Sequence, residues 1–219
     1  MLRLLFEKTG NAVWISHLDL MRLFQRAFKR AGLPLTHTQG FNPRPSVSIA
    51  LPLSVGVESV CELLDFDLDG ESVPCDEMCG RLNQALVPGV RVLQVYDTGR
   101  KLKELAYLDC AVALEYDNGI PESAQEAIRN LFSSPSLVVP KKGKNGMQDQ
   151  DIIPMIQSLE INQAGERELV LNARISCQNP SLNPMQLAAA INIYLPGLKP
   201  DFAKCRRIEI YDGNNTVFR

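Results

Sequence analysis

The sequence predicts an α+β protein built from two tandem ferredoxin-like units, each with the element order βαββαβ and an antiparallel sheet. Three observations predict this. Strand-like and helix-like segments follow this order over residues 1–100. The same order returns over residues 101–219, with a period of about 105 residues. The chain has 219 residues, 45% of them apolar, which is enough for one or two domains with buried cores.

The first helix is the clearest element of the first unit. Ser16 is a favourable N-cap, and Asp19, three residues later, completes a short capping box. Apolar residues then recur at the spacing of an amphipathic helix, and Gly32 with Pro34 stops it after Ala31. The other elements follow from short apolar or alternating runs, which predict strands at 2–6, 47–51, 64–69 and 90–95 and a helix at 74–86.

The second unit shows weaker but similar signals. They predict strands at 108–116, 156–161, 169–176 and 205–211, and helices at 121–132 and 184–194. The segment 141–149 is an insertion relative to the first unit, and its glycine and lysine content predicts a mobile surface loop. Its lysines, together with Lys204, Arg206 and Arg207, either extend a basic surface or only keep the chain soluble.

Charge is distributed unevenly along the chain. The formal net charge is −2. Residues 1–50 hold seven basic and two acidic side chains, a local charge of +5, whereas residues 51–100 hold three basic and nine acidic, a local charge of −6. Because a local field depends on the local excess, near-neutrality of the whole chain does not exclude a polyanionic partner for the first segment.

Four cations occupy one face of the first helix, opposite its apolar stripe: Arg22, Arg26, Lys29 and Arg30. Their only acidic neighbour on that face is Asp19, so most of them repel one another slightly. Such a ridge favours binding to phosphates, and the alternative is an ordinary solvated face. At the start of the helix, His17 and the free backbone amides predict a second polar surface suited to an anion.

The segment from Thr36 to Ser46 is the most distinctive in the chain. It combines polar, aromatic and cationic side chains with two prolines that restrict the backbone. We expect Phe41 to stack on a base, and the polar residues His37, Gln39 and Arg44 to contact base edges or phosphate. The alternative is a structural crossover in which Phe41 packs into the core.

Three motifs resemble a bacterial family of radical SAM-linked (radical SAM-associated) proteins of unknown function. They are Ile15–Arg22, Gln39–Pro43 and Ala50–Ser59. The resemblance is specific over residues 1 to about 70 and looser over the remainder. It implies a radical SAM protein as partner, either fused or on a separate chain, and it implies no particular reaction.

The same tandem architecture is similar, at the level of fold alone, to CRISPR-associated repeat-RNA endonucleases. This similarity suggests a metal-independent ribonuclease in which His17 and His37 act as base and acid. A second alternative is a non-catalytic protein-interaction scaffold, in which the cationic helix docks on an acidic face of a partner or of a second copy of the chain, such as the strand that contains Asp65.

Several further sites are considered and set aside. Cys75 and Cys79 have the first spacing of a radical SAM cluster motif, but Leu82 stands where the third thiolate belongs. Asp65, Asp67 and Asp69 nearly match an EF-hand loop, but they alternate with apolar residues, which predicts a strand with one solvated acidic face. No Walker-type phosphate loop is found. We therefore expect no metal and no cofactor, and six cysteines that are mostly buried free thiols.

The functional hypothesis combines these observations. We expect an RNA-binding module, for tRNA or rRNA, that presents its substrate to a radical SAM enzyme in RNA modification or processing and is itself not catalytic. No apolar run approaches the roughly 18 residues that span a bilayer. The early charges at Arg3 and Glu7 do not fit a secretory signal, so we expect a cytoplasmic protein without a membrane partner.

Overall fold

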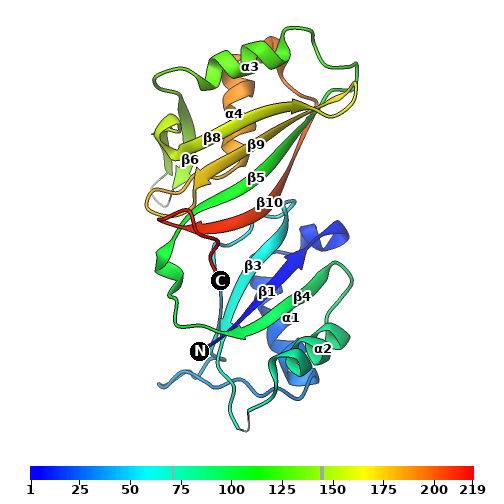
Figure 1. The fold of residues 1–219 in the computed structure, drawn as a ribbon, viewed down its shortest axis with the longest axis vertical. Helices are drawn as coiled ribbons and strands as arrows, with labels where there is room; N and C mark the ends of the chain where they lie inside the picture. The colour runs from blue at the N-terminus through cyan, green and yellow to red at the C-terminus, as the bar shows by residue number, and fades with distance from the viewer. Residues whose placement is uncertain (71, 144–145) are drawn as a thin grey trace. The chain divides into compact units, whose positions relative to one another are not determined.

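The computed structural model describes residues 1–70, 72–143 and 146–219 and shows a mixed α+β fold with mostly antiparallel strands. Four α-helices lie in the described part of the chain. The chain divides into two compact units (Figure 1). Unit 1 comprises Met1–Glu104 with Arg219, and unit 2 comprises Leu105–Phe218. The boundary lies four residues beyond the one expected at residue 100.

Unit 1 contains an antiparallel sheet with the strand order β4-β1-β3-β2. Its strands are β1 (Leu2–Lys8), β2 (Val47–Ile49), β3 (Glu58–Phe66) and β4 (Val90–Asp97). Its helices are α1 (His17–Arg30) and α2 (Cys75–Ala85), with short 3-10 turns η1 (Gly10–Trp14) and η2 (Leu102–Glu104). The central strand β1 pairs with β3 on one side and β4 on the other.

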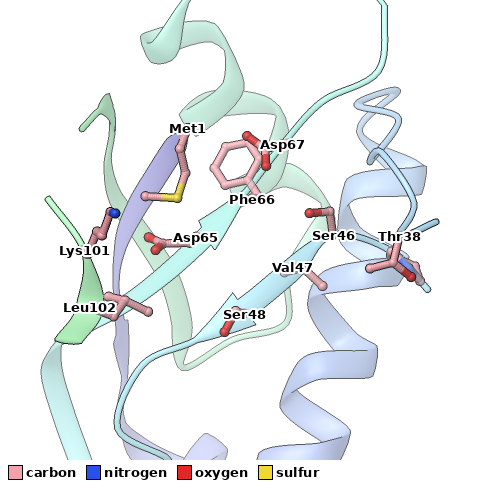
Figure 2. Close-up of a pocket in the computed structure, with 11 residues that line it drawn as sticks. Met1, Thr38, Ser46, Val47, Ser48, Asp65, Phe66, Asp67, Lys101 and Leu102 are labelled. Atoms are coloured by element: carbon pink, nitrogen blue, oxygen red, sulfur yellow. The ribbon is translucent and has the colours of Figure 1, made fainter. Parts of the chain in front are cut away.

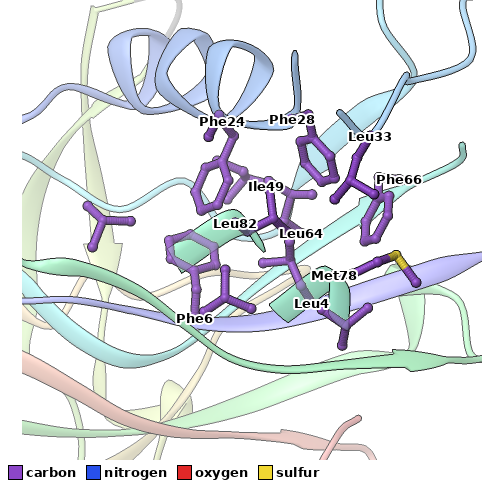
Figure 3. Close-up of a cluster of buried hydrophobic side chains, with 14 of the residues drawn as sticks. Leu4, Phe6, Phe24, Phe28, Leu33, Ile49, Leu64, Phe66, Met78 and Leu82 are labelled. Atoms are coloured by element: carbon purple, nitrogen blue, oxygen red, sulfur yellow. The ribbon is translucent and has the colours of Figure 1, made fainter. Parts of the chain in front are cut away.

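The core of unit 1 forms where α1 and α2 cover the same face of this sheet (Figure 3). Two aromatic pairs join α1 to the strands. The ring centroids of Phe6 and Phe24 lie 4.8 Å apart, as do those of Phe28 and Phe66. Because the apolar stripe of α1 is used in this contact, the helix must turn its cationic face away from the core.

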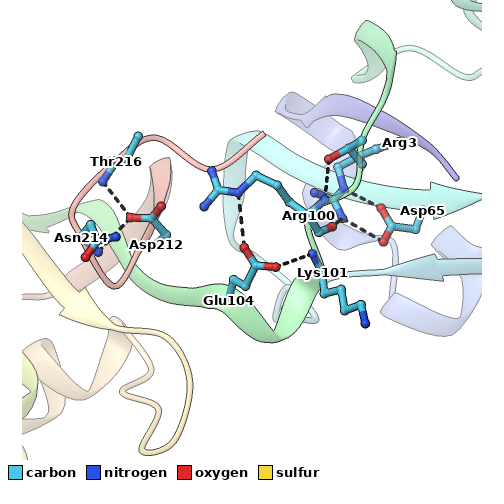
Figure 4. Close-up of polar contacts among 9 residues, drawn as sticks. Arg3, Asp65, Arg100, Lys101, Glu104, Asp212, Asn214 and Thr216 are labelled. Atoms are coloured by element: carbon cyan, nitrogen blue, oxygen red, sulfur yellow. Dashed lines mark hydrogen bonds and ion pairs between the residues drawn. The ribbon is translucent and has the colours of Figure 1, made fainter.

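Strand β3 differs from the expectation. It begins at Glu58 and ends at Phe66, so the predicted strand at 64–69 overlaps only its last residues. The expected solvated acidic face is wrong at Asp65, whose carboxylate is bound by the fully buried Arg3 (Figure 4). The Nε and Nη2 atoms of Arg3 donate to the two oxygens of Asp65 at 2.5 and 3.0 Å. Asp65 is therefore unavailable as a docking face for another helix.

Unit 2 contains a second antiparallel sheet, with the order β10-β5-β9-β8. The strands are β5 (Leu105–Glu115), β8 (Ile156–Gln163), β9 (Glu168–Ser176) and β10 (Phe202–Asp212). The helices α3 (Ala124–Phe132) and α4 (Met185–Tyr194) lie next to each other (Figure 1), and 3-10 turns occupy Ile153–Met155 and Pro196–Leu198. After β10, the Asp212 carboxylate accepts hydrogen bonds from the backbone of Asn214 and Thr216, both at 2.9 Å (Figure 4).

The insertion in unit 2 is a hairpin, so the expected surface loop is wrong. Strands β6 (Val138–Gly143) and β7 (Gly146–Asp151) pair antiparallel from Val138–Asp151 to Gly143–Gly146. The Nζ of Lys141 donates to the carbonyl of Ser181 at 2.8 Å, which ties the hairpin to the rest of unit 2. Lys144 lies outside the described residues.

All six cysteines are free thiols, as expected. Cys61, Cys110, Cys177 and Cys205 are buried, and Cys75 and Cys79 are partly buried. Burial raises the pKa of Cys177 to about 11 and that of Cys205 to about 12, because a thiolate is poorly solvated in the core.

These raised pKa values predict a loss of stability at alkaline pH. An unfolded Cys205 begins to ionise near its ordinary pKa of 9.0, while the folded thiol keeps its proton up to about pH 12. Between about pH 9 and pH 12 the unfolded state therefore binds fewer protons than the folded state. The free energy of unfolding falls as the pH rises, by about 1.4 kcal/mol at pH 10 for this thiol. Guanidinium unfolding at pH 7 and pH 10 measures the difference. We expect Cys205→Ala to reduce the pH dependence.

Candidate nucleic-acid interface

The cationic face of α1 is exposed as expected. Ser16 caps the helix, its hydroxyl accepting from the backbone amide of Asp19, which confirms the predicted start. The Ser16 hydroxyl also donates to the Asp19 carboxylate, and this contact, with the neighbouring Arg22, lowers the pKa of Asp19. Arg22 Nη1 lies 3.0 Å from Asp19 Oδ1 at the surface. One end of the cationic face is therefore partly neutralised.

The remaining three cations of this face differ in their surroundings. Arg26 and Lys29 are exposed, and the described part of the chain gives neither side chain a hydrogen-bond or ion-pair partner. The guanidinium of Arg30 instead donates to the carbonyl of Ala85, at the end of α2. That contact satisfies one of the carbonyls left free where a helix ends. Arg26 and Lys29 are thus the cations most available to an outside ligand.

In the segment Thr36–Ser46, which we call the arm, the chain turns back on itself, and hydrogen bonds join its two sides. The backbone amide of Ser46 donates to the carbonyl of Thr36 at 2.7 Å, and the Thr38 amide to the Arg44 carbonyl at 2.8 Å. The Arg44 amide donates back to the Thr38 hydroxyl at 3.0 Å. At the base, the Thr36 amide donates to the carbonyl of Asp67, just beyond β3. These bonds hold the two sides of the arm in register.

The tip of the arm carries Phe41 into solvent. Its side chain is 103% exposed, the highest value among the exposed large apolar residues of the described chain. Gly40, just before it, has a φ of +136°, a conformation that a residue with a side chain rarely adopts. The alternative in which Phe41 packs into the core is therefore wrong. Gln39 and Arg44 flank Phe41 and are exposed too.

A groove of about 450 Å³ lies between the last turns of α1 and the arm. We call it the helix groove. Gln25, Phe28 and Lys29 line it from α1, and His37 and Pro45 line it from the arm. Lys29 of the predicted helix site and His37 of the predicted loop site therefore line one groove. The structure thus brings together the two segments that the sequence singled out separately.

A second cavity, of about 460 Å³, lies on the other side of the arm (Figure 2). We call it the arm cavity. Lys101 and Leu102 lie on one side of it and Thr38 and Ser46 on the opposite side. Because side chains alternate along an extended chain, His37 faces the helix groove while Thr38 faces the arm cavity.

The arm cavity contains residues that the sequence analysis did not assign to a site. The alternating pattern predicts a solvated strand at Asp67, and no motif in the sequence singles out Ser48 or Lys101. The only sequence signal that could have found them is the closeness of Asp67 and Ser48 to the distinctive segment at 36–46. Pairing of the arm with the end of β3, which brings Asp67 to the cavity, is a long-range feature.

The two histidines do not form a catalytic pair. His17 is the first residue of α1, whereas His37 lines the groove at the other end of that helix. A helix of 14 residues is about 21 Å long, so a proton donor and acceptor at its two ends cannot act on one bond. The ribonuclease alternative therefore lacks the pair of imidazoles that it requires.

The surface at the start of α1 is less polar than expected. Trp14 and Leu18 are each 67% exposed beside His17. The Nδ1 atom of His17 is buried, and no hydrogen-bond partner for it occurs among the described residues. Apolar side chains thus flank the predicted anion-binding surface at this helix end, which stays a prediction.

Other predicted features take structural roles. Arg207 is buried, and Lys204 pairs with Glu115, so these two cations do not extend a basic surface. Cys79 donates its thiol hydrogen to the carbonyl of Val92, and burial raises its pKa. Over residues 1–70, 72–143 and 146–219, no group of three or more metal-binding side chains is found. No helix in these ranges is long and apolar enough to cross a membrane.

Comparison with known proteins gives a family and a fold. A family model described as "Uncharacterized protein conserved in bacteria (DUF2344)" matches residues 1–184. No curated protein matches the chain. The fold is similar to a chain in the crystal structure of a Cbf5-Nop10-Gar1 complex, with a TM-score of 0.56 and 8% identity over 95% of this chain and 48% of that one.

A chain of the archaeal box H/ACA sRNP Nop10-Cbf5 complex is also similar, with a TM-score of 0.47 and 10% identity over 94% of this chain and 46% of that one. The present chain thus spans about half the length of these structural neighbours. At such low identity the similarity to the first complex concerns the fold alone.

Proposed function

The chain belongs to the bacterial family DUF2344, and we propose that its first unit binds a single-stranded or looped segment of RNA. The arm supplies a stacking surface and the exposed cations of α1 supply phosphate contacts. In this proposal the module presents RNA, such as tRNA or rRNA, to a radical SAM enzyme. That partner is inferred from the resemblance of Ile15–Arg22, Gln39–Pro43 and Ala50–Ser59. In this proposal the chain presents the RNA and leaves catalysis to the partner.

The observation that carries this proposal is the position of Phe41. A phenylalanine that is fully exposed at the end of a hydrogen-bonded arm leaves its apolar surface in water, and a ligand that covers the ring gains free energy by removing that surface from water. An unstacked base is a suitable ligand, because every base has a flat face that can stack on an aromatic ring. The bonds at Thr38 and Ser46 hold the arm in place, so little order would have to be gained on binding.

The cations near the arm support the choice of RNA over an uncharged ligand. Lys29 lines the helix groove that adjoins His37, and Arg26 lies one turn back along α1. Phe41 and Arg44 are three residues apart, so their Cα atoms are at most about 11 Å from each other. A nucleotide stacked on Phe41 can therefore have its phosphate contacted by Arg44, and its neighbours by Lys29 and Arg26.

We also propose that both units are ferredoxin-like. The strand order in unit 1 is β4-β1-β3-β2, and numbering the four sheet strands of unit 2 along the chain gives the same order, 4-1-3-2. In each unit one helix follows the first strand and another precedes the last, which supports a βαββαβ fold repeated in tandem.

The salt dependence of binding tests this proposal. We expect the protein to bind a fluorescein-labelled, 12-nucleotide single-stranded RNA of mixed sequence, with an affinity that falls linearly on a log–log plot against salt. Replacing Arg26 and Lys29 together by alanine removes two phosphate contacts. The slope should become less steep by about 1.4, since each contact contributes about 0.7 for a single strand.

The matched control removes two exposed cations from unit 2, Arg129→Ala with Lys199→Ala, and changes the net charge equally. We expect this variant to keep the slope of the unmodified protein. Absence of binding at 50 mM salt, or equal slopes for the two double variants, would show that the proposed phosphate site is wrong.

A further inference from the structure

We propose that the arm cavity is a guanine-recognition pocket for the same RNA, an inference that rests on the proposed function of the arm. The cavity has room for a nucleobase, at about 460 Å³. It lies within unit 1, between the base of the arm and the segment that contains Lys101 and Leu102 (Figure 2).

The walls of the arm cavity suit a flat, partly apolar ring. Five of its lining residues are apolar and come from four segments of unit 1: Met1, Pro45, Val47, Phe66 and Leu102. The other six lining residues carry hydrogen-bonding groups: Thr38, Ser46, Ser48, Asp65, Asp67 and Lys101. Apolar walls for the faces of a ring, together with hydrogen-bonding groups for its edge, are typical of sites for small aromatic ligands.

One of the two carboxylates in the cavity is available for a ligand. Both Asp65 and Asp67 line the cavity, but the oxygens of Asp65 are held by Arg3. For the Asp67 carboxylate, the described part of the chain provides no hydrogen-bond or ion-pair partner. Both backbone polar groups of Asp67 are bonded: its amide donates to the carbonyl of Ser46 at 3.4 Å, and its carbonyl accepts from the amide of Thr36 at 2.9 Å. The position of Asp67 relative to the arm is thereby set before any ligand arrives.

The chemistry of this acceptor selects guanine among the bases. A carboxylate has two oxygens that accept hydrogen bonds and no donor. Guanine presents two adjacent N–H donors, N1–H and the N2 amine, which match the two oxygens. Adenine and cytosine each offer one amine beside an acceptor nitrogen. A carboxylate cannot donate to that nitrogen, and leaving it without a hydrogen bond lowers the affinity. The hydroxyls of Ser46 and Ser48 are further partners for the ring edge.

An arginine side chain of a peptide also presents two parallel N–H donors to a carboxylate. The ammonium group of Lys101 on the same cavity disfavours such a cation and favours a neutral base attached to a phosphate.

The position of the arm agrees with the choice of a nucleobase. Thr38, on the cavity wall, and Phe41 are three positions apart in the sequence, so their Cα atoms lie at most about 11 Å apart. A base in the cavity and a base on Phe41 can thus belong to one strand.

The test compares two labelled 12-nucleotide RNAs that differ at one position, a guanosine or an inosine in a background of uridines. Inosine lacks the N2 amine and keeps N1–H, so only the second hydrogen bond is removed. We expect the guanosine strand to bind the full-length protein about tenfold more tightly than the inosine strand. In Asp67→Asn the preference should fall below twofold, because an amide offers one acceptor in place of two.

The control is Asp69→Asn, which removes an exposed carboxylate two residues away that does not line the arm cavity. It should keep the tenfold preference. Phe41→Ala should weaken the binding of both strands and leave the ratio of their affinities unchanged.

Equal binding of the two strands by the unmodified protein overturns the guanine pocket and leaves RNA binding by the arm intact. If the protein binds neither strand, both proposals are wrong. A third outcome is that the protein shows no preference for guanosine but binds an arginine-rich peptide, and that Asp67→Asn abolishes this binding. That result assigns the cavity to a protein partner and overturns the inference.

Discussion

Replacing Arg3 by methionine should lower the free energy of unfolding by about 3–5 kcal/mol, the largest single effect that we expect on stability. Arg3 has a relative exposure of 0%, and its guanidinium binds both oxygens of Asp65 and the carbonyl of Arg100. Methionine fills part of the space but leaves the carboxylate of Asp65 without its charge partner in a site that is largely closed to water. An unpaired charge in such a site is strongly unfavourable.

Denaturant unfolding of variants at pH 7 measures this effect. The double variant Arg3→Met with Asp65→Leu removes both charges and should recover a large part of the loss, because no unpaired charge remains. Arg81→Ala breaks an exposed ion pair with Glu77 and should change stability by less than about 1 kcal/mol. A cost for Arg3→Met as small as that of Arg81→Ala would contradict the assigned role of the buried pair.

Phe41→Ala should weaken RNA binding by about 5- to 150-fold, which corresponds to roughly 1–3 kcal/mol for one stacked base. Stability should change by no more than about 0.5 kcal/mol, since the ring contributes nothing to the core. Phe41→Trp keeps an aromatic face and should bind at least as tightly as the unmodified protein. This combination separates a ligand-stacking ring from a structural one.

Fluorescence anisotropy with labelled RNA measures the affinities of these variants, and thermal unfolding measures their stability. An unchanged affinity for Phe41→Ala would show that the ring does not contact RNA. A large loss of stability would place Phe41 in the core, against its full exposure at the tip of the arm.

Local patterns predicted much of the fold. The capping pair Ser16 and Asp19 and the apolar repeat after it placed α1 within one residue of its observed bounds, because these signals act over a single helical turn. Apart from the hairpin β6–β7, the order of strands and helices in both units followed from the same kind of signal. The exposure of the cationic face of α1 was also predictable, since an amphipathic helix buries its opposite face.

The features that escaped prediction depend on pairing between distant segments. Arg3 and Asp65 are 62 residues apart, and only the register of β1 with β3 shows that a carboxylate in an alternating run is a buried ion-pair partner. The arm cavity likewise depends on the contact of Thr36 with Asp67, 31 residues away. The hairpin at 138–151 was missed because glycine and lysine favour turns but do not exclude strands at an exposed edge.

Ultraviolet crosslinking of the full chain to single-stranded RNA, followed by mass-spectrometric mapping of the modified peptides, tests the central claim most directly. We predict that the main crosslinked nucleotide lies on the peptide that contains Phe41, and that a hundredfold excess of unlabelled RNA removes it. Crosslinks that fall mainly in unit 2, or a pattern that Phe41→Ala leaves unchanged, would contradict the proposal that the arm binds RNA.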